Sequence, residues 1–433
     1  VAEHVMALML SFARGLPQLM RAQQARLWLQ EGEIRDRFEL GGQTLVIVGL
    51  GAIGLVAATI LVGAGIGGLA VASGLQRAGA EVIVLEQAAR FLPRGSGLSL
   101  LSNGFAALRS LGLEERVREV VADGPPSIPY GTRRADGTRL TEFSPATLAD
   151  LRVVDRTDLH RALLRDLAPD TVRPGIRVEG LSRETLDLGP SGLLEDWHVL
   201  VGADGIRSRV RGSHAGDPGA AYCGYGAWRG ITDTPVALPD SGETFGRGER
   251  FGYVPLRDGR VYWFAVRPAA DDDLPEPGEL EERYGEWHDP IPALLAATAP
   301  ERIGYQPIER LAHPLRTYSR GPATLVGDAA HAMPPTLGQG ANLALEDAAV
   351  LVSLLRPIAR DHDPRDIPTK LAAYDKARRP RTQSIARQAY LIGAALQWPT
   401  PLFVRGRDVA MRAAPNAMMD RVFRSAQRWS PPD

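Results

Sequence analysis

The chain has 433 residues, and its 50 Lys+Arg against 51 Asp+Glu give a formal net charge of −1 at pH 7. Hydrophobic residues make up 44% and charged residues 23%, which excludes disorder, collagen and coiled coil as descriptions of the whole chain. The balanced charge gives no electrostatic reason to expect a nucleic-acid partner. The length predicts two or three domains.

A single cysteine, Cys223, excludes an internal disulfide and every cysteine cluster that would bind zinc or an iron–sulfur centre. We predict no metal site, and one cysteine is consistent with a reducing, cytoplasmic location. The only lysines of the chain are Lys370 and Lys376, and neither follows a glycine. A Walker A phosphate loop, which needs a Gly-Lys pair, is therefore excluded as well.

The amino-terminal part of the chain is apolar. Residues 3–29 have the spacing of an amphipathic helix. From Leu40 to Gln76 no residue is charged, so a transmembrane span has to be considered. The ten glycines of this run cluster into two loops, however, and two short buried strands over 44–48 and 59–62 explain it better. We therefore predict no membrane span.

Further along, the pattern predicts a βαβ unit and then alternating helices and strands. The unit consists of the strand over 59–62, a helix over 68–77 and a strand over 81–86. Other helices are predicted over 105–113 and 158–167 and from residue 340 onward, and strands from residue 199, within 222–268 and at 325–326. The segment 124–150 reads as loops and short strands, and the arginine-rich tail after residue 364 as helices broken by prolines.

Two Gly-x-Gly-x-x-Gly motifs compete, one over residues 49–54 and one over 63–68. Such a loop brings a pyrophosphate close to the backbone and to a helix amino terminus. A working site also needs a strand ending in an acid about 20 residues later. Only the second motif has one, Glu86, which is 23 residues after Gly63 and precedes Gln87. The glycines of the predicted dinucleotide site are Gly63, Gly65 and Gly68.

Two further segments place acids at strand ends. Residues 199–208 read as a strand that runs into Asp204, and residues 327–342 as a strand end with Asp328 and then a glycine loop that opens a helix. In this order, and together with the second fingerprint, the motifs resemble the class A FAD-dependent aromatic monooxygenases, to which para-hydroxybenzoate and salicylate hydroxylases belong. The resemblance runs from about residue 56 to the end of the chain.

The resemblance implies an α/β fold, with a Rossmann-like FAD-binding domain, an inserted, mostly antiparallel β substrate domain and a helical carboxy-terminal tail. The implied division gives 56–123, 150–212 and 320–360 to the FAD-binding domain, 124–149 and 213–319 to the substrate domain, and 361–433 to the tail.

It also implies how FAD is bound. Glu86 would accept hydrogen bonds from the adenosine ribose, and Asp328 would bind the ribityl chain. Arg156 would contact FAD near its diphosphate, and Asp204 would serve both FAD and the nicotinamide nucleotide. The loop 338–342 would direct backbone N–H groups at the pyrimidine edge of the flavin. The cofactor-binding residues expected from the resemblance are Gly63, Gly65, Gly68, Glu86, Gln87, Arg156, Asp204, Asp328, Pro335, Gly338, Gln339, Gly340, Ala341 and Asn342.

Several of these residues have a structural alternative. Asp204 and Asp328 are also ordinary choices for a turn or a helix amino-terminal cap. The aromatic residues between Tyr222 and Phe264 fit either a substrate pocket or a core. We identify no catalytic base, and His331 is not assigned as one because the flavin carries the oxygen chemistry.

The reaction implied is hydroxylation of an aromatic or polyketide-like small molecule with NAD(P)H and O₂ through a C4a-hydroperoxyflavin. The expected cofactor is FAD, with NADH or NADPH as co-substrate. The expected partners are a small aromatic substrate and O₂, in a cytoplasmic monomer or homodimer.

Residues 1–55 resemble a different family, the D-2-hydroxyacid dehydrogenases. The segments 1–10 and 40–54 match the inter-domain helix and the first NAD-domain strand of that family, but they end before its catalytic residues. This predicts a fusion of a truncated dehydrogenase segment to a monooxygenase. The alternatives are therefore an NAD-dependent dehydrogenase fragment or a non-catalytic, misfolded fusion product. A halogenase of the same fold is disfavoured because its Trp-x-Trp-x-x-Ile-Pro segment is missing.

Overall fold

The structure is a computed structural model that describes residues 59–91, 96–123, 128–182, 185–195, 197–214, 216–270, 273–276, 278–361 and 364–432. All of these residues belong to one compact unit, Val56–Asp433. The helix predicted over 3–29, the strand over 44–48 and the whole dehydrogenase-like segment lie outside the described residues.

A six-stranded sheet carries the second glycine fingerprint. Its strand order is β17 (Ser319–Arg320), β18 (Ala323–Leu325), β11 (Val199–Gly202), β1 (Thr59–Val62), β2 (Val82–Glu86) and β7 (Val172–Pro174). All neighbours are parallel except β17 and β18. Both β1 and β11 are buried along their whole length, which agrees with the unbroken apolar runs of strands covered on both faces. The segments that follow β1, β11 and β18 therefore emerge at one edge of the sheet.

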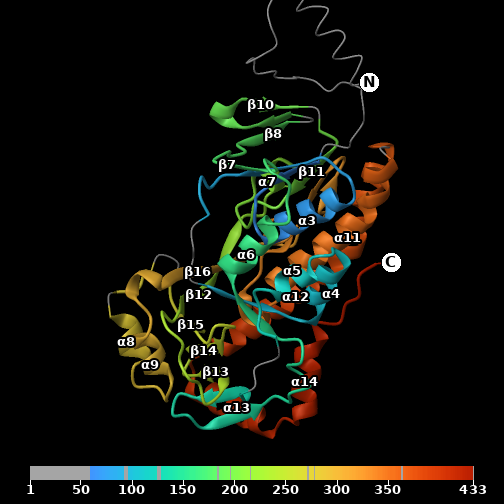
Figure 1. Cartoon of the computed structure of the whole chain (residues 1–433). Coiled ribbons are helices and arrows are strands. Elements are labelled where there is room, and N and C mark those ends of the chain that lie inside the picture. The colour runs from blue at the N-terminus through green and yellow to red at the C-terminus, as the bar shows by residue number, and fades with distance from the viewer. Residues whose placement is uncertain are drawn as a thin grey trace, which may run out of the picture. The chain divides into compact units, whose positions relative to one another are not determined.

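Two long helices pack together beside this sheet, α3 (Ile66–Arg77) and α11 (Gly340–Asp361) (Figure 1). A Cβ on Gly67 would stand 3.2 Å from the Cβ of Ala344, so glycine permits the close approach. Smaller helices in this part are α4 (Ser102–Ser110), α5 (Glu114–Arg118), α6 (Arg156–Leu164), α7 (Arg209–His214) and α10 (Asp328–His331). Helix α6 begins two residues before the predicted start because the Asp155 side chain accepts a hydrogen bond from the Thr157 N–H and caps it.

A seven-stranded sheet contains most of the aromatic segment. Its order is β16 (Gly304–Leu311), β12 (Ala220–Ile231), β15 (Val261–Pro268), β14 (Arg250–Pro255), β13 (Ser241–Phe245), β4 (Tyr130–Arg134) and β5 (Arg139–Glu142). Every pair is antiparallel except β13 with β4. Helices α8 (Glu279–Tyr284) and α9 (Ile291–Ala296) cover one face (Figure 1) and bury Trp228, Phe251 and Trp263 against it.

Short elements complete the description. A three-stranded sheet has the order β10 (Leu193–Leu194), β9 (Thr185–Asp187) and β8 (Gly180–Ser182), and β3 (Gly97–Leu100) pairs with β6 (Arg152–Asp155). The 3₁₀ turns are η2 (Gly189–Ser191), η3 (Pro300–Arg302), η4 (Pro335–Leu337) and η5 (Pro364–Asp366).

The tail contains α12 (Ile367–Leu396), α13 (Pro401–Ala413) and α14 (Asn416–Ser425). The expected break at a proline is wrong at Pro380, which lies inside α12. The residues around the proline are held in place, since Arg378 and Thr382 are fully buried and the Thr382 hydroxyl donates to the Arg378 carbonyl at 3.0 Å. Among the helices that the structure describes, none is long and apolar enough to cross a membrane.

Candidate active site

The loop between β1 and α3 has the shape of a phosphate cradle. A Cβ on Gly63, where φ is +104°, would stand 2.4 Å from the Ala203 carbonyl oxygen, and one on Gly68 would stand 2.1 Å from the Gly63 oxygen. The backbone itself therefore requires these two glycines. Gly65 differs, because a Cβ there would meet nothing within 4 Å, and Gly65 occupies the N-cap position before α3 without a side-chain cap. Open space at an uncapped helix amino terminus suits a phosphate.

The end of β2 is tied to this loop through Glu86. Its Oε2 accepts a hydrogen bond from the Ala64 N–H at 2.8 Å, and its Oε1 accepts one from the Ala88 N–H at 2.8 Å. Each carboxylate oxygen retains capacity for a second donor. Glu86 is half-buried beside the glycine loop, and the next residue, Gln87, is exposed.

Asp204 and Asp328 follow the strands β11 and β18 at the same edge of the sheet. The Asp204 carboxylate accepts hydrogen bonds from the Ser208 hydroxyl at 2.6 Å and from the Arg209 N–H at 2.7 Å, so it caps α7. Burial raises the pKa of Asp204, although these hydrogen bonds favour the charged form. Asp328 begins α10 with an exposed side chain, and no hydrogen bond from another described residue reaches its carboxylate.

A second glycine loop leads into α11. Gly338 has φ +61°, and a Cβ on Gly340 would meet nothing within 4 Å. The loop is held by Asn342, which is fully buried. Its Nδ2 donates to the carbonyls of Gly338 at 2.8 Å and Ser99 at 2.9 Å, and its Oδ1 accepts from the Leu101 N–H at 3.0 Å. The Asn342 side chain is thus occupied in holding the loop against β3.

The other expected site residues surround these two loops. Pro335 opens η4 and is exposed, Ala341 is half-buried in the first turn of α11, and Gln339 is buried. Arg156 is the exposed first residue of α6, and its N–H donates to the Ser96 carbonyl at 2.9 Å. Open space at Gly65 and at Gly340, together with the acid at Glu86, makes the arrangement fit an FAD.

The face of the seven-stranded sheet opposite α8 and α9 carries charged and aromatic side chains. Residues paired across neighbouring strands share a face. The register pairs Glu243 with Gly252, and Gly252 in turn with Phe264. Arg250 is two residues from Gly252 on β14, and Tyr262 is two residues from Phe264 on β15. Both therefore lie on the same face as Glu243 and Phe264. The buried Arg250 donates from Nη1 to Glu243 Oε2 at 3.2 Å, and its guanidinium carbon stands 5.4 Å from the centroid of the Phe264 ring. Its Nε has no partner among the described residues.

Two buried hydroxyls face each other next to the second glycine loop. Tyr225 lies on β12 and Thr336 on η4, directly after Pro335. A Cβ on Gly393 would stand 2.8 Å from each of the two oxygens, so they converge on one spot. Neither oxygen makes a well-formed hydrogen bond with a described residue. Burial raises the pKa of Tyr225, and the facing Thr336 hydroxyl opposes that rise.

The sequence profile of the family described as "FAD binding domain" matches residues 43–389. The chain belongs to the class A FAD-dependent aromatic hydroxylases. It is 33% identical over 388 residues to an aurachin C monooxygenase/isomerase of Stigmatella aurantiaca, covering 86% of this chain and 98% of that one. It is 32% identical to a 2-heptyl-3-hydroxy-4(1H)-quinolone synthase of Pseudomonas aeruginosa, covering 84% of this chain and 96% of that one.

Solved structures agree with this assignment. The structure of Klebsiella pneumoniae HpxO with FAD and uric acid matches with a TM-score of 0.77 and 26% identity, covering 86% of this chain and 96% of that one. A salicylate hydroxylase in complex with its substrate matches with a TM-score of 0.71 at 22% identity, which shows the fold alone. The predicted fusion receives no support, because the matched range begins at residue 43 and includes the first fingerprint as well.

Behind the second glycine loop, this hydroxylase has a buried ionic network that the sequence analysis missed. The Asp347 carboxylate accepts from His331 Nε2 at 2.6 Å, from the Gly327 N–H at 2.9 Å and from Arg378 Nε at 2.7 Å. Burial alone would favour the neutral acid, but His331 and Arg378 lower the pKa of Asp347 to about 2. His331 is therefore a structural partner of Asp347.

The network continues through Glu346 to the glycine loop. Glu346 accepts from Arg378 Nη1 at 2.7 Å and from Asn103 Nδ2 at 2.6 Å. The same Asn103 Nδ2 donates to Gln339 Oε1 at 2.9 Å, which fixes a side chain of the loop itself. The sequence did contain a signal of this network. Glu346 and Asp347 are adjacent acids in the otherwise apolar stretch 343–352, and charged side chains are buried only when they have partners.

An arginine-lined hollow of about 490 Å³ lies beside the Asp204 loop of the hydroxylase. Its arginines are Arg177, Arg207, Arg209 and Arg211. Arg211 is fully buried and pairs with Asp217, whereas Arg209 is exposed and forms no ion pair with any described residue. Arg177 pairs with Glu179 at 3.5 Å, and Arg207 pairs with Glu309 at 3.0 Å. Arg209 is therefore the arginine of the hollow whose charge no described acid neutralises.

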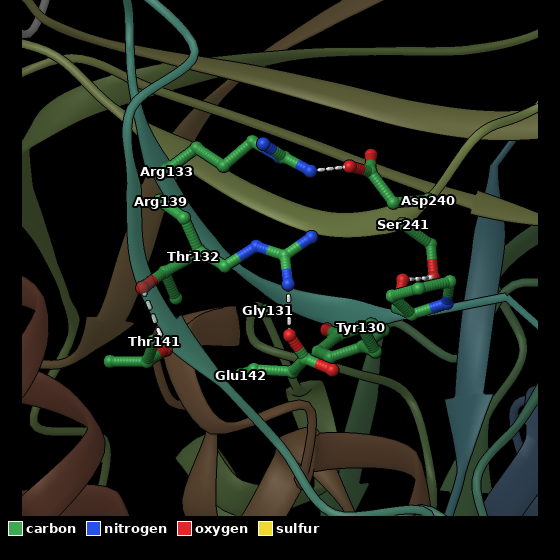
Figure 2. A pocket seen from close by; sticks show the side chains of 10 residues that line it. Tyr130, Gly131, Thr132, Arg133, Arg139, Thr141, Glu142, Asp240 and Ser241 are labelled. Carbon is green, nitrogen blue, oxygen red and sulfur yellow. Dashed lines mark hydrogen bonds and ion pairs between the residues drawn. The ribbon is translucent and has the colours of Figure 1, made fainter.

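A smaller gap between β4, β5 and residues 240–241 is not a substrate site. Figure 2 shows Arg133 pointing to Asp240 and Arg139 pointing to Glu142. The hydroxyls of Thr132 and Thr141 are 2.8 Å apart. The gap measures about 10 Å³, which is room for a single water at most.

Proposed function

We propose that this enzyme hydroxylates a planar aromatic heterocycle of the quinolone class, using FAD, O₂ and a reduced nicotinamide nucleotide. The observation that carries the proposal is that α3 and α11 pack together and have open space at their amino termini, at Gly65 and at Gly340. Bound FAD would supply the oxygen chemistry, and the residues of the chain would bind, orient and shield the reactants. We propose the cofactor roles and the domain division described above on the same basis.

The substrate class is proposed from the polar atoms that lack partners. Arg250 Nε and the hydroxyls of Tyr225 and Thr336 are buried, and a buried polar group without a partner is costly. A ligand that brings ring carbonyl or hydroxyl groups would satisfy them, while Phe264 and Tyr262 would contact its flat face. The names of the relatives refer to a heptylquinolone, to aminohydroxybenzoate and to urate, which are all planar rings with such groups.

The electron donor is proposed from the arginine-lined hollow. Both NADH and NADPH carry a pyrophosphate, and NADPH carries one further phosphate. Arg209, which is exposed and has no ion pair with a described residue, suits these anions. Because Asp204 follows β11 next to the glycine loop of β1, the hollow adjoins the proposed FAD site.

The test is a visible spectrum of the purified chain, recorded without oxygen before and after NADH or NADPH is added. We expect bands of oxidised flavin that bleach with at least one of the two nucleotides. The enzyme and the reduced nucleotide are then incubated under ¹⁸O₂ with a panel of candidate substrates that contains a 2-alkyl-4(1H)-quinolone and 3-amino-4-hydroxybenzoate. The masses of the products are measured by mass spectrometry. We expect one ¹⁸O atom in the product. A chain that takes up no FAD, or an Asp328→Ala variant with unchanged FAD affinity, would count against the assignment.

A further inference from the structure

Helix α13 presents an apolar and basic face to solvent. Leu402 is 80% exposed and Val409 is 66% exposed. They are seven residues apart, which is close to two helical turns, so they lie along one line of the helix. Arg405 and Arg412 are also exposed and seven residues apart, and they form a second line next to the first. Trp398, 56% exposed, lies three residues before the start of the helix.

The adjoining side of α13 is anchored. Asp408 is buried, and its carboxylate accepts hydrogen bonds from Arg134 Nε at 2.7 Å and from Arg407 Nη2 at 2.8 Å. Arg407 also stands over the Phe245 ring at 5.3 Å from its centroid. Because Arg134 belongs to β4 and Phe245 to β13, the helix is fixed to the seven-stranded sheet, as its place in Figure 1 shows. The exposed line of residues is therefore carried on a rigid support.

Charge at this end of the chain is strongly biased. The arginines between residues 398 and 432 are Arg405, Arg407, Arg412, Arg421, Arg424 and Arg428. The acids from residue 398 to the last residue of the sequence are Asp408, which is buried, Asp420, whose Oδ2 accepts from the Ser144 hydroxyl at 3.0 Å, and Asp433. Asp136 lies within electrostatic range of Arg412 and balances part of its charge. The face nevertheless stays cationic around Leu402 and Val409.

We propose that this face of α13 docks the enzyme reversibly on an anionic lipid bilayer. Apolar side chains flanked by arginines and a tryptophan suit the headgroup region, because the former enter the acyl boundary while the latter meet phosphates. A nucleic acid would account for the arginines but not for exposed Leu402. A two-fold dimer through this face would account for Leu402 but would bring Arg405 and Arg412 against their own copies. The inference goes beyond the proposed function and does not depend on it.

The experiment is co-sedimentation of the full chain with vesicles, without substrate. One set contains phosphatidylglycerol and phosphatidylcholine in equal parts, and the other contains phosphatidylcholine alone. We expect binding to the anionic vesicles that weakens about tenfold or more at high salt, because screening removes the arginine contribution. The variants L402D/V409D and R405E/R412E should each lose about tenfold or more in affinity. The matched controls are L274D, at a loop position that is 70% exposed, and R165E/R320E. These controls should bind like the parent.

Each other outcome overturns the proposal. No binding to anionic vesicles at low salt rejects the lipid partner. Binding that L402D/V409D leaves unchanged is general polyanion binding and also rejects it. Self-association in sedimentation velocity that L402D/V409D abolishes, without vesicle binding, identifies the face as a contact between copies of the chain. Circular dichroism of every variant, with thermal unfolding, confirms that the folded chain is compared in each case.

Discussion

The Glu86 carboxylate accepts a hydrogen bond from the Ala64 N–H at 2.8 Å and so joins the end of β2 to the glycine loop that follows β1. A hydrogen bond to a charged group contributes about 1.5–3 kcal/mol. We therefore expect Glu86→Gln to weaken FAD binding about tenfold or more, because the loop loses its anchor and the ribose loses an acceptor. The dissociation constant for FAD is measured by titration of the flavin fluorescence. Glu81→Gln, at an exposed position before β2, is the control and should bind FAD like the parent. Equal affinities for the two variants would remove Glu86 from the site.

The two glycines of the fingerprint should respond differently to alanine. At Gly65 the added Cβ meets no protein atom within 4 Å, so Gly65→Ala should fold normally and lose FAD affinity about tenfold or more. At Gly68 the Cβ would stand 2.1 Å from a backbone oxygen, so Gly68→Ala should lose stability itself. Thermal unfolding of both apoproteins, followed by FAD titration, separates the effects. Normal FAD binding by Gly65→Ala would show that no phosphate lies there.

Removal of the Tyr225 hydroxyl separates a structural role from a functional one. The facing Thr336 hydroxyl is the side-chain group beside this oxygen, and no well-formed hydrogen bond joins them, so Tyr225→Phe should leave the free energy of unfolding unchanged within about 0.5 kcal/mol. If the hydroxyl binds substrate, KM should rise several-fold, or NAD(P)H should be oxidised without product. The comparison variant is Tyr253→Phe, whose hydroxyl donates to Asp240 at 2.6 Å and which should lose stability instead. Unaltered turnover and coupling in Tyr225→Phe would contradict the proposed contact between its hydroxyl and the substrate.

The buried carboxylate of Asp347 should make the free energy of unfolding depend on pH in the acidic range. Its pKa is about 2 in the folded protein, below the roughly 3.9 of an unfolded aspartate. Its contribution is therefore fully present above about pH 4 and is lost as the pH falls from about 4 toward 2. Asp347→Asn should cost about 3–5 kcal/mol at neutral pH, since it leaves Arg378 short of a partner. Urea unfolding between pH 3 and 7 tests both statements. Asp258→Asn, at an exposed site, is the control, and a similar loss in both variants would refute the assignment.

The arginine-lined hollow predicts a salt-dependent nucleotide site. Arg209→Glu should raise the KM for the reduced nicotinamide nucleotide about tenfold or more while leaving FAD content unchanged, because it places a negative charge next to the phosphates. The rate of anaerobic flavin reduction against nucleotide concentration is the readout. Arg165→Glu, at an exposed position of similar chemistry, should behave like the parent. If the two variants reduce flavin alike, the nucleotide binds elsewhere.

Some structural features could be predicted from the sequence, and others could not. The strand over 59–62 and the start of α11 at Gly340 were predicted correctly, because glycine loops and apolar runs have local causes. The pairing of Arg250 with Glu243 was not foreseen, since it depends on the register between β13 and β14. The aromatic segment was left open between core and pocket. The register divides it, with Trp263 under α8 and α9 and Tyr262 on the other face.

Asn342 illustrates what the order of residues can and cannot determine. Its motif identified the loop, and the structure shows its side chain bonded to Leu101, which is 241 residues away in the chain. The amino-acid sequence by itself determined the family, the second fingerprint and the acids at the strand ends, because each rests on spacing within one short segment. Only the tertiary structure decided that Asp204 caps α7, that His331 is bonded to Asp347, and that Arg250 lies over Phe264. These contacts join distant segments, so they follow from strand register and helix packing and not from any local pattern.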